Sequence, residues 1–385
     1  MAAWGYHGMT RTDRSVEGPV FRGAGMSSDG VLTDQVFGGE KPVDARNRLD
    51  EAALQEWMLQ HVAGCGGPLR TITQFKGGQS NPTYRLETPD GSYVLRRKPF
   101  GKLLRSAHAV EREFRVIAAL HAAGFPVPKP YALCEDAAVI GSPFYVMQHV
   151  AGRLFWDGTL PNLDREERRA IYHAQIDTLA RLHRLKPEDL GLADFASPGS
   201  YFTRQVERWT KQYRASETQS VPAMEKLIEW LPRTVPPQTR VSIVHGDFRL
   251  DNQIFAAHSC EVLAVIDWEL STLGDPLADM SYVMMNWMMP ADGRSGLAGL
   301  DLEALGVPAS RELIERYCRA MGWEGVPELS WYFAFNLFRL AGIMQGIAKR
   351  RLDGTAVSDD AERLAAQTVP VANKAWDFAR KAGAS

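Results

Sequence analysis

The stretch "VHGDFRLDN" (244–252) places groups capable of acid–base and metal chemistry directly after a short apolar run. Asp247 and Asn252 lie within it, and Asp267 follows in the apolar "AVIDWEL" (264–270). A strand–loop–strand hairpin would bring the three side chains together. One acid could then accept a hydroxyl proton, while the amide and the second acid supply the oxygen ligands that Mg²⁺ prefers. Phosphoryl transfer uses this arrangement.

Each of these residues, taken singly, also has a structural explanation. Asp247 and Asn252 could be turn formers, and Asp267 could be a hydrogen-bonded buried acid. The ordered set of three is harder to obtain by chance, and we therefore favour the catalytic interpretation.

Neighbouring residues of the same loop and the segment after it have further expected roles. Arg249 could face a transferring phosphate and neutralise developing charge, or it could be a solvated loop arginine. His245 is expected to hold the loop through backbone hydrogen bonds. Asp275 and Asp279 in "LGDPLADM" are expected to be structural, with Asp275 at a helix N-cap.

A phosphate donor needs its own binding loop, and "GGQSN" (77–81) lies between two expected strands. Such a loop can offer backbone N–H groups to phosphates, which makes Gly78, Ser80 and Asn81 candidate donor-binding residues. A plain hairpin loop is the alternative.

Arg96, in the strand-like "YVLRR", could hold donor phosphates if an acid fixed its position. Glu113 on the following predicted helix is the candidate partner and Glu111 its competitor. Both glutamates could instead lie on a solvated helix face.

The chain of 385 residues exceeds a single average core, so two lobes are expected. Alternating patterns predict strands at 69–75, 83–88, 92–98 and 142–152, and helical periodicity predicts helices at 48–63 and 107–123. After residue 152, predicted helices dominate, at 165–185, 200–215, 222–231, 276–289, 310–321, 329–351 and 359–381. Only short buried strands at 241–247 and 262–268 interrupt them.

Composition limits the classes of partner. Lys plus Arg (44) nearly cancels Asp plus Glu (46), so there is no electrostatic case for nucleic acid or an anionic membrane as the main partner. No apolar run approaches the roughly 20 residues of a membrane helix. The four cysteines are widely spread without a CxxC pair, which suits a reducing compartment and predicts a cytoplasmic protein. Residues 1–45 are polar and Gly-rich and are expected to form a disordered leader.

The motifs together resemble the aminoglycoside phosphotransferase family of the protein-kinase-like superfamily. "HGDFRLDN" resembles its catalytic loop, "VIDWE" its metal-binding strand and "GDPLAD" the segment that follows. The resemblance covers about residues 48–380. It implies an α+β, bilobal fold, with a nucleotide-binding, antiparallel-sheet N-lobe at 46–147, a hinge at 148–152 and a helical C-lobe at 153–385.

The resemblance also implies roles and cofactors. It makes Asp247 the catalytic base and Asn252 and Asp267 the ligands of Mg²⁺. Arg96 becomes the cation that binds the phosphates of ATP, with Glu113 as its partner.

The segment Gln148, His149 and Val150 resembles the hinge that receives adenine. The chain departs from the family pattern at Arg96, where relatives carry Lys, and the two side chains differ in geometry as well as in pKa. Arg97 or Lys98 could therefore take this place.

One branch fits more closely. "GGQSNPTYRL" and "FYVMQHVAGR" resemble the kinase-like domain fused to acyl-CoA dehydrogenases in animals, and its stand-alone bacterial relatives. This implies phosphorylation of the 4-hydroxyl of a hydroxyacyl-CoA and a functional pairing with an acyl-CoA dehydrogenase. Lys98, Lys102 and Arg105 could hold the CoA phosphates, or form a solvated basic loop. The alternatives are a kinase for choline or an aminoglycoside, and a nucleotide-binding pseudokinase.

The expected acceptor wall is apolar, at 282–289 and 331–343. Such a wall would suit an acyl chain, although most of its residues could equally be core. An aminoglycoside would instead need a cluster of acids, which the sequence does not present. Asn336 and Arg339 are the polar exceptions in the second segment, and buried polar groups need partners.

Overall fold

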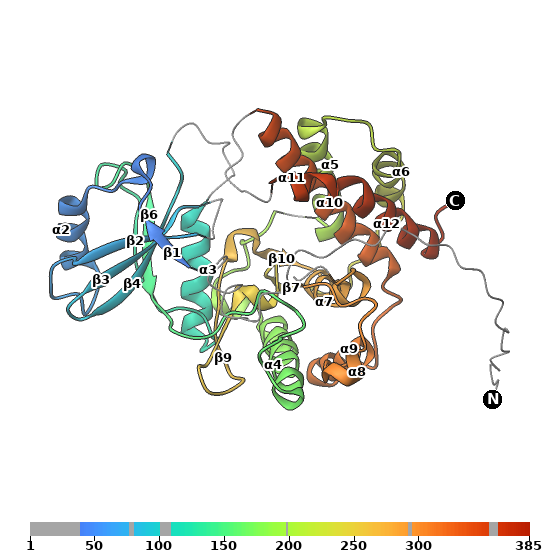
Figure 1. Cartoon of the computed structure of the whole chain (residues 1–385), viewed down its shortest axis with the longest axis horizontal. Coiled ribbons are helices and arrows are strands. Elements are labelled where there is room, and N and C mark those ends of the chain that lie inside the picture. The colour runs from blue at the N-terminus through green and yellow to red at the C-terminus, as the bar shows by residue number, and fades with distance from the viewer. Residues whose placement is uncertain (1–38, 77–80, 101–108, 198, 292–294, 354–360) are drawn as a thin grey trace, which may run out of the picture.

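The computed structural model describes residues 39–76, 81–100, 109–197, 199–291, 295–353 and 361–385. Figure 1 shows two lobes, a small one built on a sheet and a larger helical one. This arrangement confirms the predicted α+β, bilobal fold.

The small lobe is built on one six-stranded antiparallel sheet with strand order β1-β2-β3-β4-β6-β5. Its strands are β1 (Glu40–Pro42), β2 (Thr71–Phe75), β3 (Thr83–Thr88), β4 (Gly91–Arg97), β5 (Pro130–Cys134) and β6 (Phe144–Gln148). The alternating patterns therefore located the central strands correctly.

The predicted boundary of the leader at residue 45 is wrong, because β1 pairs with β2 at the sheet edge. Three residues that end in proline carry too short a pattern to indicate a strand, and proline is tolerated only at such an edge. Residues 1–38 of the predicted leader lie outside the described residues.

Two helices pack on this sheet. Helix α2 (Glu51–His61) covers one side, where Trp57 meets Phe144 of β6 edge to face. Helix α3 (Val110–Ala122) lies between the sheet and the large lobe (Figure 1) and carries Glu113 toward β4. Packing of these two helices holds the small-lobe sheet in place beside the space between the lobes.

The large lobe contains nine helices among the described residues. They are α4 (Arg165–Arg184), α5 (Tyr201–Ser216), α6 (Pro222–Trp230), α7 (Leu277–Met284), α8 (Leu302–Leu305), α9 (Ser310–Met321), α10 (Ser330–Leu352), α11 (Ala361–Ala366) and α12 (Thr368–Lys381). Helix α8 was not predicted, because four residues carry no detectable period. The helix predicted at 276–289 continues beyond Met284 as a 3₁₀ turn. The helix predicted at 359–381 is interrupted at Gln367, whose amide bonds back to Leu364.

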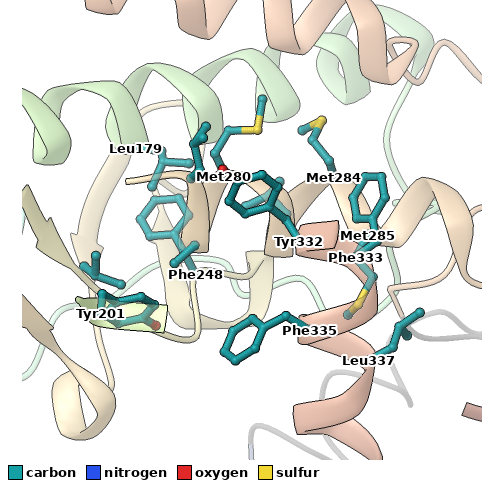
Figure 2. Packing of buried hydrophobic residues seen from close by; sticks show 14 of the residues in the cluster. Leu179, Tyr201, Phe248, Met280, Met284, Met285, Tyr332, Phe333, Phe335 and Leu337 are labelled. Carbon is teal, nitrogen blue, oxygen red and sulfur yellow. The ribbon is translucent and has the colours of Figure 1, made fainter. Parts of the chain in front are cut away.

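Helix α10 is the centre of the large-lobe core and packs against α5, α7 and α12. Figure 2 shows its Tyr332 and Phe335 in one buried cluster with Phe248, the residue after Asp247, and Met280 of α7. Most of the two segments expected to form an acceptor wall is therefore core, which was the alternative interpretation. The core also seats the loop that carries Asp247.

Two short sheets position that loop. Strand β7 (Ser242–Val244) pairs with β10 (Thr272–Gly274), and β8 (Gln253–Phe255) pairs with β9 (Val262–Val265). The two predicted strands thus do not form the expected hairpin with each other. Each pairs with a three-residue strand that the sequence did not reveal.

Among the residues with described positions, no helix has both the length and the apolar character that crossing a bilayer requires.

Candidate active site

A cavity of about 350 Å³ lies between the lobes. Apolar side chains from both lobes line it: Val94, Ile117, Met147, Val150, Leu154 and Ile266. Its polar end is formed by Arg96, Asp251, Asn252 and Asp267. An apolar pocket with a few convergent polar groups has the properties of a small-molecule site.

The predicted hinge borders this cavity, since Gln148, His149 and Val150 all line it. Two of its amides already donate within the sheet, from Gln148 to the carbonyl of Lys129 (2.8 Å) and from His149 to that of Ser92 (3.4 Å). A nucleobase would therefore meet the carbonyl oxygens of this segment or the amide of Val150.

Gly152 ends the hinge where the chain passes close to β8. A Cβ atom there would lie 2.3 Å from the carbonyl oxygen of Phe255. The next residue, Arg153, exchanges backbone hydrogen bonds with Phe255 at 2.7 and 2.9 Å. Only glycine permits this approach, which closes the cavity on the side of the large lobe.

Arg96 lies at the centre of a buried ion-pair network. Its Nε lies 2.9 Å from Oε2 of Glu113, and its Nη2 lies 2.8 Å from Oδ1 of Asp267 and 3.1 Å from Oε2 of Glu269. Burial works against the charge of Arg96, but the surrounding carboxylates outweigh it and raise its pKa well above the ordinary value. Burial also raises the pKa of Glu113, against the opposing pull of Arg96.

The alternatives for this cation lie elsewhere. Arg97 points to the other face of the sheet, where it is fully buried and donates to Tyr84 and Asn47 at 3.0 and 3.1 Å. Lys98 pairs with Glu111 at 2.8 Å. Of the three candidates, Arg96 is the one that lines the cavity. Arg97 faces the opposite side because adjacent residues of a strand alternate, and Lys98 lies beyond the end of β4.

Asp279 of α7 anchors the loop after β7 through hydrogen bonds to its backbone. This fully buried carboxylate accepts hydrogen bonds from the backbone N–H groups of His245 and Gly246, both at 2.7 Å. Gly246 adopts φ +86, and a Cβ there would meet the carbonyl oxygen of Leu270 at 2.9 Å. Glycine is therefore required for the turn.

His245 makes the backbone contacts that were predicted for it, whereas α7 begins one residue later than expected, with Pro276 in place of Asp275 at its N-cap. The Nδ1 of His245 accepts the amide of Asp247 at 3.1 Å, and its Nε2 lies 2.9 Å from the carbonyl oxygen of Ile266. Asp275 accepts the amide of Leu277 at 2.9 Å, and burial raises the pKa of Asp275. These contacts fix the loop before and after the candidate catalytic residues.

Asp247 lies among several polar partners. Its Oδ2 accepts from the amide nitrogen of Asn252 at 3.1 Å, and its Oδ1 lies 3.2 Å from Nε of Arg249. Burial alone would raise the pKa of Asp247. The charges of Arg249 and Arg339, together with the hydroxyl of Tyr282 within hydrogen-bonding reach, outweigh burial and lower it. Asp247 therefore stays ionised and able to accept a proton.

Asn252 and Asp267 meet across the β8–β9 hairpin, where the amide of Ile266 donates to the carbonyl of Asn252 at 2.9 Å. The amide nitrogen of Asn252 donates to Asp247, so its Oδ1 is the atom that could face a cation. Asp267 adopts φ +66, a left-handed conformation that is uncommon for residues other than glycine and that gathers at functional sites.

Two acids of this site were missed by the sequence analysis. Glu269 joins Glu113 and Asp267 in a cluster whose carboxylate oxygens all lie within 4.8 Å of one another. Asp251 lies 3.1 Å from Nη2 of Arg249, which thus bridges two acids. A signal existed for Glu269, because it follows Asp267 by two residues in the same turn.

The predicted phosphate loop is covered only in part. Gly78 and Ser80 lie outside the described residues, as do Lys102 and Arg105 of the predicted CoA-binding loop. Asn81 is described and is fully buried, two residues before the start of β3.

The sequence model of the family described as "Phosphotransferase enzyme family" matches residues 71–329. The chain belongs to this family. The match covers both lobes and every described residue of the candidate site, and it confirms the predicted family and the predicted class of phosphotransferase acting on a hydroxyl group.

Relatives of two kinds are similar to the chain. Acyl-CoA dehydrogenase family member 10 of Mus musculus is 46% identical over 347 residues, which are 89% of this chain and 32% of the relative. Acyl-CoA dehydrogenase family member 11 of Homo sapiens is 41% identical over 341 residues, 87% of this chain and 44% of the relative. The chain thus spans less than half the length of these relatives.

A solved structure from Ralstonia eutropha, provisionally assigned as an aminoglycoside phosphotransferase, is 47% identical and aligns with a TM-score of 0.78. It covers 87% of this chain and 99% of its own. The predicted resemblance to the kinase-like domain of acyl-CoA dehydrogenases is therefore confirmed by the curated relatives, and the fold by the solved structure.

Proposed function

We propose that the chain is an ATP- and Mg²⁺-dependent kinase that phosphorylates the 4-hydroxyl of a hydroxyacyl-CoA. One observation carries the kinase assignment. Asp247 is hydrogen-bonded to Asn252, and Asn252 lines the interlobe cavity together with Asp267 and Arg96. We infer that these residues supply a proton acceptor, two oxygen ligands for a metal and a cation for phosphates at one end of the pocket.

The cavity suits ATP. Its apolar walls come from both lobes and would enclose the base, next to the hinge at Gln148–Val150. Arg96 at the polar end would bind phosphate oxygens, which a planar guanidinium can bind through two hydrogen bonds.

The donor set also suits Mg²⁺. Asn252 and Asp267 offer hard oxygen atoms, with Glu269 beside them, and Mg²⁺ binds few protein ligands together with phosphate oxygens. When bound, the metal would supply neutralisation of the charge on the transferred phosphoryl group. The residues that hold it would be Asn252 and Asp267.

In the proposed reaction Asp247 accepts the proton of the acceptor hydroxyl. The hydroxyl oxygen forms a bond to the γ-phosphorus, and the bond from that phosphorus to the bridging oxygen breaks to leave ADP. Asp247 is suited to this because its lowered pKa keeps it ionised and because Asn252 fixes its orientation. Arg249, paired with Asp247 and Asp251, would face the phosphoryl group from the same loop.

The names of the relatives support the proposed acceptor. Proteins named for acyl-CoA dehydrogenases contain a segment similar to this chain, which supports an acyl-CoA acceptor and a functional pairing with such a dehydrogenase. The four cysteines, Cys65, Cys134, Cys260 and Cys318, are free thiols. They support a reducing compartment, for which we propose the cytoplasm.

The test measures ATP consumption and the phosphorylated product with 4-hydroxyacyl-CoAs, free 4-hydroxy acids, choline and aminoglycosides. We expect product only from the thioesters and, more slowly, from the free acids. Asp247→Asn should lower kcat on the order of 10²–10⁴-fold, the range for loss of a general base, with unchanged ATP affinity. Near-normal turnover of this variant would remove the role of Asp247, and no product from any acceptor would favour a pseudokinase.

A further inference from the structure

Arg339 of α10 is a buried cation next to the candidate catalytic base that the proposed reaction does not use. The residue is 6% exposed. Its guanidinium carbon lies 5.3 Å from the ring centroid of Trp209 on α5 and 5.3 Å from that of Tyr282 on α7. The positive charge is thus held between two aromatic rings from two other helices.

The described residues give Arg339 no carboxylate partner. None of the ion pairs within this part of the chain includes it, and its Nε is buried without a hydrogen-bond acceptor. Stacking on aromatic rings offsets only part of the cost of burying a cation that has no counter-charge. A ligand oxygen would complete the site.

Tyr282 connects this cation to Asp247. The tyrosine ring stacks against Arg339, and its hydroxyl lies within hydrogen-bonding reach of the carboxylate of Asp247. The charge of Arg339 is also among the causes that lower the pKa of Asp247. An acceptor whose hydroxyl met Asp247 would therefore have its next few atoms close to Arg339.

The surroundings of Arg339 select against cationic acceptors. Arg208 of α5 lies against the same ring as Arg339, with its guanidinium carbon 5.6 Å from the centroid of Trp209, and the charge of Arg339 adds to desolvation in lowering the pKa of Arg208. Within the described chain, neither arginine is paired with an acid. An amine-rich acceptor would have to approach these two positive charges, and like charges repel one another.

We propose that Arg339, held by Trp209 and Tyr282, is the residue that binds a carbonyl or carboxylate oxygen of the acceptor and so positions its hydroxyl at Asp247. This rests on the proposed kinase function and narrows its substrate class to hydroxyl compounds with such an oxygen a few bonds away. A thioester carbonyl and a free carboxylate share this chemistry. A simple diol of equal length does not.

The experiment compares three acceptors of equal chain length: a 4-hydroxyacyl-CoA, the free 4-hydroxy acid and the corresponding diol. The wild-type enzyme should prefer the thioester or the acid over the diol. Arg339→Gln should raise the KM for the preferred acceptor about 10- to 100-fold, the equivalent of a lost charge-assisted hydrogen bond. The KM for ATP should stay unchanged, because Arg339 is not among the residues that line the cavity between the lobes.

Two further variants separate binding from folding. Arg240→Gln removes another arginine that stacks on an aromatic ring, Trp323 at 3.9 Å, and should leave the acceptor preference unchanged. Arg339→Lys keeps the charge and serves if the Gln variant does not fold, with an expected partial rise in acceptor KM.

The outcomes distinguish the two proposals. If the wild-type enzyme phosphorylates diol and acid alike, or if Arg339→Gln slows all acceptors equally, the role of Arg339 is refuted while the kinase function stands. If no acceptor is phosphorylated at all, the kinase function itself fails. Thioester and acid rates compared with each other identify which oxygen source is used.

Discussion

Arg96 of β4 and Asp267, just after β9, form an ion pair that joins the two lobes at the end of the cavity, with Nη2 and Oδ1 2.8 Å apart. The same guanidinium reaches Glu113 and Glu269. Three carboxylates so close together repel one another unless a cation lies among them. Arg96 supplies that positive charge, and the phosphates of a nucleotide would bind the same guanidinium.

The first prediction separates Arg96 from its neighbour in the strand. Arg96→Ala should raise the KM for ATP about 10- to 100-fold, because a charge-assisted contact to phosphate is lost, with little change in the KM of the acceptor. Arg97→Ala is the matched control. It removes a cation that donates to Tyr84 and Asn47 on the opposite face, so it should lower Tm and leave the KM for ATP unchanged. Steady-state kinetics and thermal unfolding of both variants test this prediction. If Arg97→Ala raised the KM for ATP and Arg96→Ala did not, Arg97 would be the residue that binds the phosphates.

The second prediction concerns the metal. Asp267→Ala should abolish Mg²⁺-dependent binding of ATP, measured by calorimetric titration with and without Mg²⁺, because its carboxylate would link metal and phosphates. Glu269→Gln should raise the Mg²⁺ concentration needed for half-maximal activity while preserving turnover at saturating Mg²⁺. If Asp267→Ala binds Mg-ATP like the wild type, Asp267 serves only to neutralise Arg96.

The sequence indicated the candidate site residues more readily than the scaffold that holds them. Asp247, Asn252 and Asp267 were predicted because their types and order are unusual, whatever strands carry them. The pairing was predicted wrongly because β8 and β10 have three residues each, too few for a period-2 pattern to emerge. Glu113 and Glu111 could not be separated, since helical phase alone does not say which face meets β4.

Arg339 could be recognised as unusual from the sequence, but its surroundings could not be predicted. Its position on an apolar helix marked it as exceptional in the sequence. The two rings that hold it come from α5 and α7, far away along the chain, and only tertiary packing brings them to one place.

The third prediction is a pH effect. Arg249 lies 3.2 Å from Asp247 and is the main cause that lowers the pKa of Asp247 against burial. Arg249→Gln removes this charge while burial remains, so the pKa of Asp247 rises. Because Asp247 must be ionised to accept a proton, the acidic limb of the pH profile of kcat/KM should move to higher pH. Arg233→Gln, at an exposed pair with Glu229, should leave the limb in place. An unmoved limb in Arg249→Gln would mean that Asp247 does not set it.

The last prediction concerns the support of the catalytic loop. Asp279 is fully buried and accepts the amides of His245 and Gly246, and His183 lies 3.3 Å from its Oδ2. Asp279→Ala leaves two buried N–H groups without an acceptor, at roughly 1–3 kcal/mol each. The free energy of unfolding in urea should therefore fall by roughly 2–6 kcal/mol, and kcat should fall as the loop loosens.

Asp275→Ala is the control for this variant, because Asp275 accepts a single amide, that of Leu277. Loss of one capping bond should cost about 0.5–2 kcal/mol. Asp279→Asn, which keeps one acceptor oxygen, should fall between the two in stability. Asp279→Ala could instead unfold at the wild-type urea concentration and keep its kcat. The buried carboxylate would then be dispensable, and the loop would be held by its own backbone turn at Gly246 and by the packing of Phe248.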